Sequence, residues 1–303
     1  MARGIFHTLK RFWYKRRIRL HRLFPLSDER CVKMLFYRDM GYTPDLEHPK
    51  TFNEKIQWLK LYYHRPECTM MVDKVAAKEY VAGIIGEEYI IPTLGVWERF
   101  EDIDFDALPE QFVLKCSHDC KSVVICTDKS TFDKEAARKL LTKSLKNNYY
   151  IKFREWAYKN IPPRILAEKY MVDESGTELK DYKFSCVDGD AKDVMLCMDR
   201  ASGDTKFYFF DREWNLLRYN RRGKEAPEGF TVPQPKNMDK MFDIASRLSE
   251  GLPFVRVDLY NVDGAIYFGE LTMYPRSGFD NNLLPETDLL FGERITLPEE
   301  KII

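Results

Sequence analysis

The spacing of apolar residues along the chain switches repeatedly between a helical period and strand-like alternation. A helix is predicted from Thr51, where Glu54 completes a capping-box spacing and a stripe follows at Ile56, Leu59 and Tyr63. Further helices are predicted over 72–85, 131–146 and 238–248. Short apolar or alternating runs predict strands over 89–92, 94–97, 112–116, 123–126, 164–171, 179–187, 193–198, 206–210, 254–260 and 265–272. Helices interspersed with paired strands favour an α+β fold with mainly antiparallel sheets.

Length and composition narrow the class of protein. With 303 residues, 44% of them apolar, the chain can bury a sizeable core, and it favours two domains or one domain with an inserted lid. Its 48 Lys and Arg balance 48 Asp and Glu, which argues against a nucleic-acid-binding module. No apolar run approaches the length of a membrane-spanning helix, no secretory signal is visible, and the seven cysteines show no zinc-like spacing. We therefore expect a cytoplasmic protein with reduced thiols.

Residues 3–22 differ from the rest of the chain. They carry eight Lys and Arg, and the first acidic residue follows only at Asp28. Apolar residues, among them Phe12 and Trp13, are interleaved at roughly helical spacing. A basic amphipathic helix of this kind can lie in an anionic membrane interface, which would make the protein peripheral on the inner face of a membrane. A solvated helix packed on the body of the protein fits the pattern equally well.

The run 254–275, FVRVDLYNVDGAIYFGELTMYP, carries the most informative chemistry. Its Asn-Val-Asp-Gly segment predicts a three-residue hairpin loop with a bulge, a register that places Arg256 opposite Glu270 and Asp258 opposite Phe268. A two-residue turn is expected to put Asp258 and Glu270 on opposite faces. In the predicted register one face carries Arg256, Asp258, Glu270 and Thr272, because side chains alternate along a strand.

Two carboxylates beside an arginine on an apolar hairpin are costly to bury unless a cation or another partner compensates them. Carboxylate oxygens suit Mg²⁺, particularly where phosphate oxygens complete its coordination. A purely structural arginine–carboxylate cluster has the same composition. The hairpin alone leaves both interpretations open.

Several long strings, in order, resemble the TupA-like ATP-grasp family, over roughly Leu26 to Phe291. The strings are TFNEKIQWLKLYY, VDKVAAKEYV, IGEEYIIPTLGVW, FVLKCSHD, EWAYKNIPPRILAEKY, LKDYKF, LPFVRVDLY and FGELTMYP. The family is associated with bacterial surface polysaccharides such as capsule and teichuronopeptide. The resemblance implies an ATP-grasp fold, in which two α+β subdomains hold ATP between antiparallel sheets. The implied chemistry is ATP-dependent ligation of a carboxylate to an amine through an acyl-phosphate.

The resemblance also implies a division of the chain. After the basic segment 1–25 we expect an N-terminal region over 26–98, a lid subdomain over 99–190 and a C-terminal subdomain with the carboxylate hairpin over 191–303. In the nucleotide site, Lys74 is similar to the helix lysine that reaches the α-phosphate, and Lys115 to the second phosphate-binding lysine. Asp181 is implied to bind the ribose hydroxyls. The adenine-binding hinge corresponds to Glu168, Lys169, Tyr170 and Met171.

The family chemistry implies further roles around the hairpin. Asp258 and Glu270 become Mg²⁺ ligands, with Thr272 where many members place Asn. Arg256 would stabilise the transferring phosphoryl group or the acyl-phosphate, a role that Lys115 would share. Arg200, or alternatively Lys206, would approach the γ-phosphate. The substrate's own carboxylate is the nucleophile, so the implied reaction needs no catalytic Ser or Cys.

Two positions depart from the family pattern. The loop after Lys115 usually carries glycines, whose backbone closes over phosphates, but here it reads SHDCKSVV, and no Gly occurs between Val96 and Ser175. Arg276 stands where a small residue is commoner. Lys121 and Arg276 could supply charge in place of the lost backbone cradle. Alternatively the lid is degenerate and the protein only binds a nucleotide.

Three functions therefore remain. The first is an ATP- and Mg²⁺-dependent ligase that joins the carboxylate of a uronic-acid-type saccharide to an amine acceptor, in a bacterial capsular or other surface polysaccharide or its precursor. The second is a glycosyltransferase of the same pathway; the Asp-Gly-Asp at 188–190 matches its D-x-D motif, but is better explained as a hairpin turn. The third is a non-catalytic nucleotide-binding protein.

Overall fold

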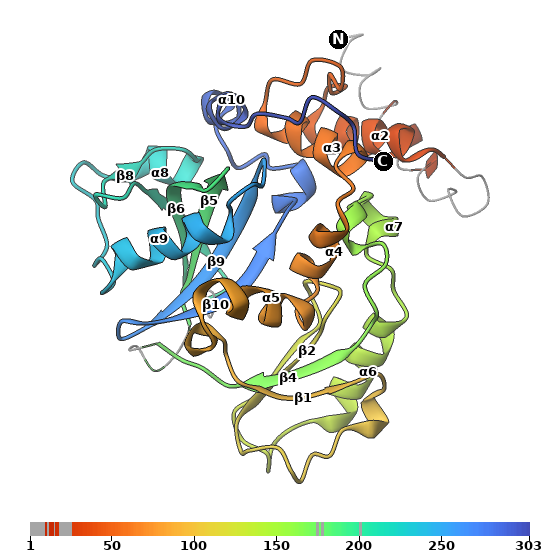
Figure 1. Ribbon diagram of the computed structural model, residues 1–303, viewed down its shortest axis with the longest axis vertical. Coiled ribbons are helices and arrows are strands. Elements are labelled where there is room, and N and C mark those ends of the chain that lie inside the picture. The colour runs from red at the N-terminus through yellow and green to blue at the C-terminus, as the bar shows by residue number, and fades with distance from the viewer. Residues whose placement is uncertain are drawn as a thin grey trace.

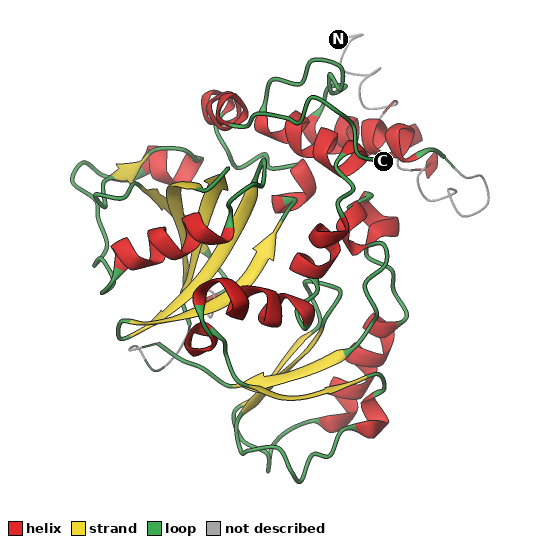
Figure 2. Cartoon of the chain, viewed as in Figure 1, coloured by secondary structure: helices red, strands yellow, loops and turns green. Residues whose placement is uncertain are grey.

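Two antiparallel sheets of unequal size form the framework of the molecule (Figures 1 and 2). The computed structural model describes residues 10, 12–14, 16–17, 26–173, 176, 179–199 and 202–303. Most of the basic segment 3–22 thus lies outside the described residues; within it, Phe12 and Trp13 are helical and exposed. None of the helices within the described ranges combines the length and the apolar composition that a bilayer crossing demands.

The larger sheet has the strand order β10-β9-β5-β6-β7-β8, and neighbouring strands are antiparallel. Helices α5 (Ala76–Ile85) and α9 (Met238–Leu248) pack against one face of it, which leaves the opposite face for polar side chains (Figure 1). The strands are β5 (Asp181–Val187), β6 (Asp190–Met198), β7 (Lys206–Phe210), β8 (Leu216–Leu217), β9 (Val255–Val262) and β10 (Ala265–Thr272).

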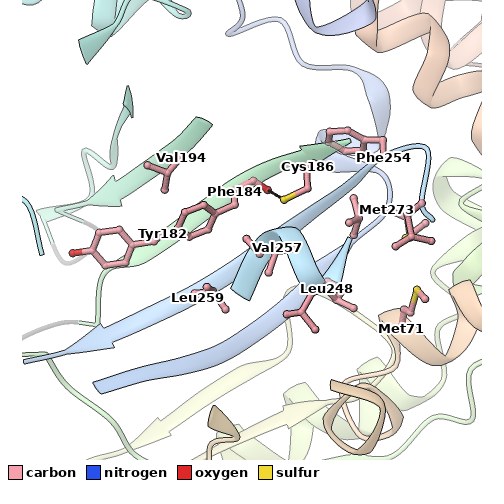
Figure 3. Close-up of a cluster of buried hydrophobic side chains, with 14 of the residues drawn as sticks. Met71, Tyr182, Phe184, Cys186, Val194, Leu248, Phe254, Val257, Leu259 and Met273 are labelled. Atoms are coloured by element: carbon pink, nitrogen blue, oxygen red, sulfur yellow. Dashed lines mark hydrogen bonds between the residues drawn. The ribbon is translucent and has the colours of Figure 1, made fainter. Parts of the chain in front are cut away.

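The covered face of the larger sheet forms the main hydrophobic core (Figure 3). Val257 and Leu259 of β9 point into this core and are completely buried. Helix α9 adds Phe242, whose ring meets Phe184 of β5 edge to face at 4.9 Å. Truncation of a buried Phe to Ala usually costs about 3–5 kcal/mol. This packing fixes the orientation of β9, and with it the direction of the alternate polar residues Arg256 and Asp258.

The smaller sheet has the order β1-β4-β2-β3, with β1 (Thr93–Trp97), β2 (Phe112–Cys116), β3 (Val123–Cys126) and β4 (Ile165–Lys169). Helix α6 (Lys134–Leu145) covers one face, where Phe112, Leu114 and Leu141 are completely buried. Alternation along β2 and β4 directs Lys115 and Glu168 to the opposite face.

Sheet membership divides the chain at other points than the boundaries expected after residues 98 and 190. β1 precedes residue 99 but already belongs to the smaller sheet, because Trp97 pairs with Ile165 of β4. β5 precedes residue 191 but belongs to the larger sheet, because Lys183 pairs with Asp258 of β9. The small subdomain therefore begins with β1 and ends with β4.

Of the remaining helices, α4 and α8 contact the larger sheet, and the others pack mainly on neighbouring helices and turns. Helix α3 contacts both α10 and the short 3₁₀ turn Pro275–Gly278. The end of the chain returns to α3, where the Ile302 amide donates to the Tyr62 carbonyl at 2.8 Å (Figure 1). These helices are α2 (Asp28–Met40), α3 (Phe52–Tyr62), α4 (Pro66–Val72), α7 (Tyr150–Phe153), α8 (Arg221–Glu225) and α10 (Pro285–Arg294).

Most predicted elements are present, one of them begins late and one is wrong. The capping box is confirmed, since the Thr51 hydroxyl accepts from the Glu54 amide and the Glu54 carboxylate accepts from the Thr51 amide, both at 3.2 Å. The helix predicted over 72–85 is interrupted by a turn, in which the Asp73 carboxylate accepts from the Val75 amide at 3.0 Å. The strand predicted over 89–92 is replaced by a 3₁₀ turn at 87–89 and a single bridge from Ile90 to Phe268.

Candidate functional site

The β9–β10 hairpin brings the two carboxylates together through a different register from the predicted one. The turn has two residues, Asp263 and Gly264, with φ of 51° and 94°. By itself such a turn separates Asp258 and Glu270, but a β-bulge between Phe268 and Glu270 shifts the pairing by one residue. Asp258 therefore lies directly opposite Glu270. The predicted convergence is confirmed, while the predicted three-residue loop is wrong.

Gly269 is the residue at the bulge. A Cβ there would lie 3.0 Å from the Asp258 carbonyl oxygen and 3.0 Å from the Tyr260 ring. Glycine thus lets β10 approach the strand that carries Asp258. The bulge is what restores a common face for the site.

Arg256 is the centre of the polar cluster on this face. Its Nε and Nη2 donate to the two oxygens of Asp258 at 2.6 and 2.7 Å. Nη2 also donates to Glu270 at 3.1 Å and to the Thr272 hydroxyl at 3.0 Å. The arrangement of Arg256, Asp258, Glu270 and Thr272 on one face is confirmed.

Lys183 of β5 was not identified from the sequence. It lies opposite Asp258 in the strand pairing, and its ammonium contacts the second oxygen of that carboxylate. It also lies 3.6 Å from Asp181, which opens the same strand. The alternation in LKDYKF, which puts Asp181 and Lys183 on one face, was the signal that could have revealed it.

The two carboxylates occupy different environments. The Asp258 side chain is 1% exposed and Glu270 is 38% exposed, so Glu270 is the one that solvent and ligands can reach. Burial tends to raise the pKa of Glu270, but Lys74, Arg256, Lys183 and Lys115 outweigh it and lower the pKa to about 2. Burial raises the pKa of Asp258, against the opposing effect of Arg256 and Lys183.

The donor set fits a hard divalent cation that also binds phosphate. Asp258 and Glu270 are opposite each other, and the Thr272 hydroxyl lies 3.3 Å from a Glu270 oxygen, so carboxylate and hydroxyl oxygens are side by side. Within the described residues no three His, Cys, Asp or Glu side chains gather as a site built from protein ligands alone requires. Mg²⁺ would be held by Glu270 and by Asp258, which it would share with Arg256 and Lys183.

On the smaller sheet, Lys115 and Glu168 form an ion pair at 2.5 Å. Lys78 of α5, a second residue that was not identified from the sequence, binds the other Glu168 oxygen at 2.6 Å. Burial opposes ionisation of Glu168, but Lys115 and Lys78 prevail and lower its pKa. Glu168 thus holds two lysines instead of only flanking the predicted hinge. Lys78 follows Lys74 by four residues in VDKVAAKEY, the spacing that could have identified it.

Lys74 lies in the turn before α5, not within a helix as expected from the resemblance. Its ammonium donates to the Asp119 carbonyl in the glycine-free loop. It is also the largest cationic contribution that lowers the pKa of Glu270. Lys74 and Lys115 therefore bring positive charge from the turn and the smaller sheet toward the carboxylates of the larger one.

The glycine-free loop is fastened by its own side chains. The Asp119 carboxylate accepts from the hydroxyls of Ser122 and Ser144, the latter on α6. His118 is buried and lies 3.1 Å from the carbonyls of Ser144 and Asn147. Hydrogen bonds to α6 therefore fix this loop, whereas glycines would leave its backbone conformationally free. Lys121 is exposed on this loop.

The other predicted residues are more dispersed. Lys169 is exposed at the end of β4, where its amide donates to the Pro92 carbonyl at 3.0 Å, and Tyr170 and Met171 follow it. Arg200 lies outside the described residues, and Lys206 pairs with Asp199 at 2.6 Å. The Asp188-Gly189 turn is confirmed, with φ of 45° and 80°, so the literal D-x-D spans a hairpin.

A cavity of about 650 Å³ adjoins the carboxylate cluster on the same face of the larger sheet. Arg256, Glu270 and Lys183 line it. Arg276, which departs from the family pattern, also lines it. The predicted metal site thus opens into a space that can hold an organic substrate.

The fold consists of a small and a large antiparallel sheet. Lysines of the small sheet and of an adjoining turn face paired carboxylates on the large sheet. This arrangement is an ATP-grasp architecture of the α+β class. The TupA-like ATPgrasp family matches residues 54–296, and the chain belongs to this family. No protein of curated function matches it.

Solved structures that are similar are distant in sequence. D-alanine–D-alanine ligase from Bacillus anthracis, complexed with ATP, is 15% identical over 74% of this chain and 63% of that chain, with a TM-score of 0.40. The ligase from Helicobacter pylori is 13% identical over 81% and 67%, with a TM-score of 0.43. D-cycloserine synthetase DcsG is 17% identical over 76% and 70%, with a TM-score of 0.40. This chain thus spans less than two thirds of the Bacillus anthracis ligase.

Proposed function

We propose that the protein is an ATP- and Mg²⁺-dependent ligase that joins a carboxylate to an amine through an acyl-phosphate. The observation that carries the proposal is the Arg256 cluster, in which Glu270 remains accessible beside a cavity while four cations hold its pKa at about 2. An acid that stays ionised and open beside a cluster of lysines is suited to a cation shared with phosphates. Family membership supports the choice of ATP.

In this proposal the nucleotide lies between the two sheets. Lys74 and Lys115 bind its phosphates, Asp181 the ribose, and the backbone of 168–171 the adenine, with Lys121 and Arg200 as further phosphate contacts. Asp258, Glu270 and Thr272 would hold Mg²⁺, which supplies charge neutralisation at the phosphate oxygens. All these assignments are proposals.

The reaction proceeds in two displacements. A carboxylate oxygen of the substrate attacks the γ-phosphorus, the bond to the bridging oxygen breaks, and ADP leaves with that electron pair. Arg256 stabilises the charge that develops on the transferred phosphoryl group. The amine then attacks the acyl carbon, phosphate leaves, and the amine loses a proton to give the amide.

The substrate assignment is a saccharide carboxylate of the uronic-acid type, with an amine as acceptor, in the synthesis of a bacterial capsular or other surface polysaccharide. It is supported by the association of the family with such polymers. We also propose that the protein acts in the cytoplasm and that residues 3–22 attach it peripherally to an anionic membrane surface. Unchanged liposome binding after removal of the first 25 residues would contradict the attachment.

A non-catalytic nucleotide-binding protein is the second candidate. The fastening of the glycine-free loop through Asp119 and His118, with the Lys74 ammonium on the Asp119 carbonyl, favours it. In this alternative the loop does not close over phosphates. ATP binding without ADP release in the presence of any saccharide acid and amine would support it.

The test combines a thermal midpoint with an ADP-release assay on the full chain. A ligand at a hundredfold excess over its dissociation constant stabilises the native state by about 2.7 kcal/mol, so ATP with Mg²⁺ should raise the midpoint. Glu270→Gln should abolish the Mg²⁺-dependent part of the rise. Glu135→Gln, an exposed carboxylate of α6 paired with Arg138, is the matched control. No rise with ATP, or an unchanged rise in Glu270→Gln, would refute the proposed site.

A further inference from the structure

Positive charge extends along the cavity well beyond the predicted reaction centre. At one side of the sheet, Arg256 of β9 lies beside the carboxylates. At the other, Arg221 and Arg222 of α8 line the same cavity, and α8 packs on β7. Three strand spacings separate β9 from β7, which is about 14 Å. The cavity therefore offers cations at two places that a single carboxylate cannot reach together.

The floor between these cations is mainly apolar. Ser185 of β5, Met195 of β6 and Phe209 of β7 line it, and the strand pairing directs all three to the face that carries Arg256. Phe207 extends this surface. An extended ligand can therefore cover apolar surface between two charged ends.

Within the part of the chain that the structure describes, the acidic partners of Arg221 and Arg222 are weak or exposed. Arg221 is 87% exposed and meets Glu225 at 3.4 Å, one turn along its own helix. Arg222 pairs with Asp204 at 2.9 Å, and both side chains are exposed. Surface pairs of this kind exchange readily for a stronger ligand. The arginines remain available to an incoming anion.

Arg276 is presented to the cavity by a strained and anchored turn. Arg276 and Ser277 both have left-handed backbones, with φ of 50° and 58°, a conformation that non-glycine residues adopt at a cost. The turn is held by Gln57, which donates to the carbonyls of Ser277 and Gly278 at 3.0 and 2.6 Å, and by Lys60, which donates to Ser277 at 2.9 Å. Gln57 and Lys60 are almost completely buried.

Among the described residues, the acidic partner of Arg276 is Asp280, which it meets only at the limit of an ion pair. The Arg276 side chain is 56% exposed, and its Nε lies 4.0 Å from Asp280, beyond hydrogen-bond distance. Strain held by buried polar side chains indicates a position that is fixed for function. Here the anchored turn fixes Arg276, a cation that lines the cavity.

We propose that the cavity holds an extended acidic substrate, whose further anionic groups, carboxylates or phosphates, are bound by Arg276 and, at the other side of the cavity, by Arg221 and Arg222. This inference rests on the proposed function, because it places the reacting carboxylate at Arg256. It adds that the substrate carries at least two acidic groups separated by an apolar or ring-shaped body. Guanidinium groups suit both candidate anions, since they bind carboxylates and phosphates through two parallel hydrogen bonds.

Binding of three probes tests the proposal by isothermal titration calorimetry. Glucuronic acid has one carboxylate, tetragalacturonic acid has repeated carboxylates, and glucuronic acid 1-phosphate has a carboxylate and a phosphate. We expect one of the latter two to bind at least tenfold more tightly than glucuronic acid, and the stronger one identifies the second anion. Arg276→Gly and Arg222→Met should each weaken that probe ten- to hundredfold and change the affinity for glucuronic acid less than threefold.

Two controls separate recognition from stability. Glycine suits the left-handed backbone at position 276, so Arg276→Gly should keep the thermal midpoint of the wild type while losing affinity. Arg138→Met, an exposed α6 arginine paired with Glu135, should leave all three affinities unchanged. If neither multiply charged probe binds more tightly than glucuronic acid, or if both variants keep their affinities within twofold, the proposal is wrong.

ADP release measured in the same samples distinguishes failure of the proposed ligase activity from failure of the proposed anion site. Tight binding of a multiply charged probe that depends on Arg276, without ATP turnover, would refute the ligase and retain the anion site. Turnover that is insensitive to both variants would retain the ligase and refute the anion site.

Discussion

Replacement of Lys183 by Met removes one of the two cations that contact the buried Asp258 carboxylate. A pair of unit charges at 4 Å contributes about 4 kcal/mol at an effective dielectric constant of about 20. Arg256 still holds both Asp258 oxygens at 2.6 and 2.7 Å, and the variant no longer pays to desolvate an ammonium. We therefore expect the free energy of unfolding to fall by about 2 kcal/mol.

A double-mutant cycle isolates the part of this loss that belongs to the pair. Asp258→Asn takes from the buried Lys183 and Arg256 their closest carboxylate, leaving Asp181 and Glu270 as the more distant ones, and should cost about 3 kcal/mol. The double variant Lys183→Met/Asp258→Asn lacks the lysine that has lost its closest carboxylate, so its loss should be smaller than the sum of the single losses by about 2 kcal/mol. Urea unfolding followed by circular dichroism measures all three. Losses that add to within about 0.5 kcal/mol would refute the electrostatic account of the cluster.

Two other predictions use the same unfolding assay. Cations lower the pKa of Glu270 to about 2, so its stabilising contribution is complete above pH 4.5 and is lost as the pH falls toward 2. Between pH 7 and pH 3 the advantage of wild type over Glu270→Gln should shrink by about 1 kcal/mol, a value reduced because the partly exposed side chain is screened; a pH-independent difference contradicts it. Gly278→Ala puts a Cβ 2.4 Å from Gln57 Nε2 and 2.8 Å from Ile56 Cγ2, and should cost at least about 2 kcal/mol. Gly251→Ala, also at positive φ but with no atom within 4 Å, should cost only about 1 kcal/mol, and equal losses would contradict the steric argument.

Local sequence signals predicted the elements well wherever one chemical rule decided them. The capping box starts α3 at the expected place, and α9 has the bounds predicted from its apolar stripe. These features depend on residues three or four positions apart. They can be read without knowledge of the fold.

The register of the β9–β10 hairpin could not be predicted from such local signals. Its turn chemistry predicted a three-residue loop, but the chain forms a two-residue turn, with Phe268 and Leu271 on either side of the bulge both buried. The bulge at Gly269 reconciles that packing with convergence of Asp258 and Glu270. A bulge is a property of two paired strands; the isolated Gly269 in β10 indicates one, but the pairing that results cannot be derived from either strand alone.

The sequence predicted the acidic residues of the candidate site more completely than its basic residues. Asp258 and Glu270 were found because carboxylates are rare on an apolar hairpin. Lys183 and Lys78 were missed because lysine is common on surfaces, so their spacing in the sequence did not single them out, whereas the structure shows each in contact with a buried carboxylate. Their roles follow from contacts between distant segments.

The ion pair network of Lys78, Glu168 and Lys115 has a consequence for nucleotide affinity. In the proposed complex Lys115 exchanges the Glu168 carboxylate for a phosphate, while Lys78 remains on Glu168. The Glu168 carboxylate thus occupies the phosphate position of Lys115 while no nucleotide is bound. When a phosphate displaces it from Lys115, no buried charge is left without a partner. The affinity for ATP at this position then reflects the difference between two ion pairs. A small change in either partner would tune it.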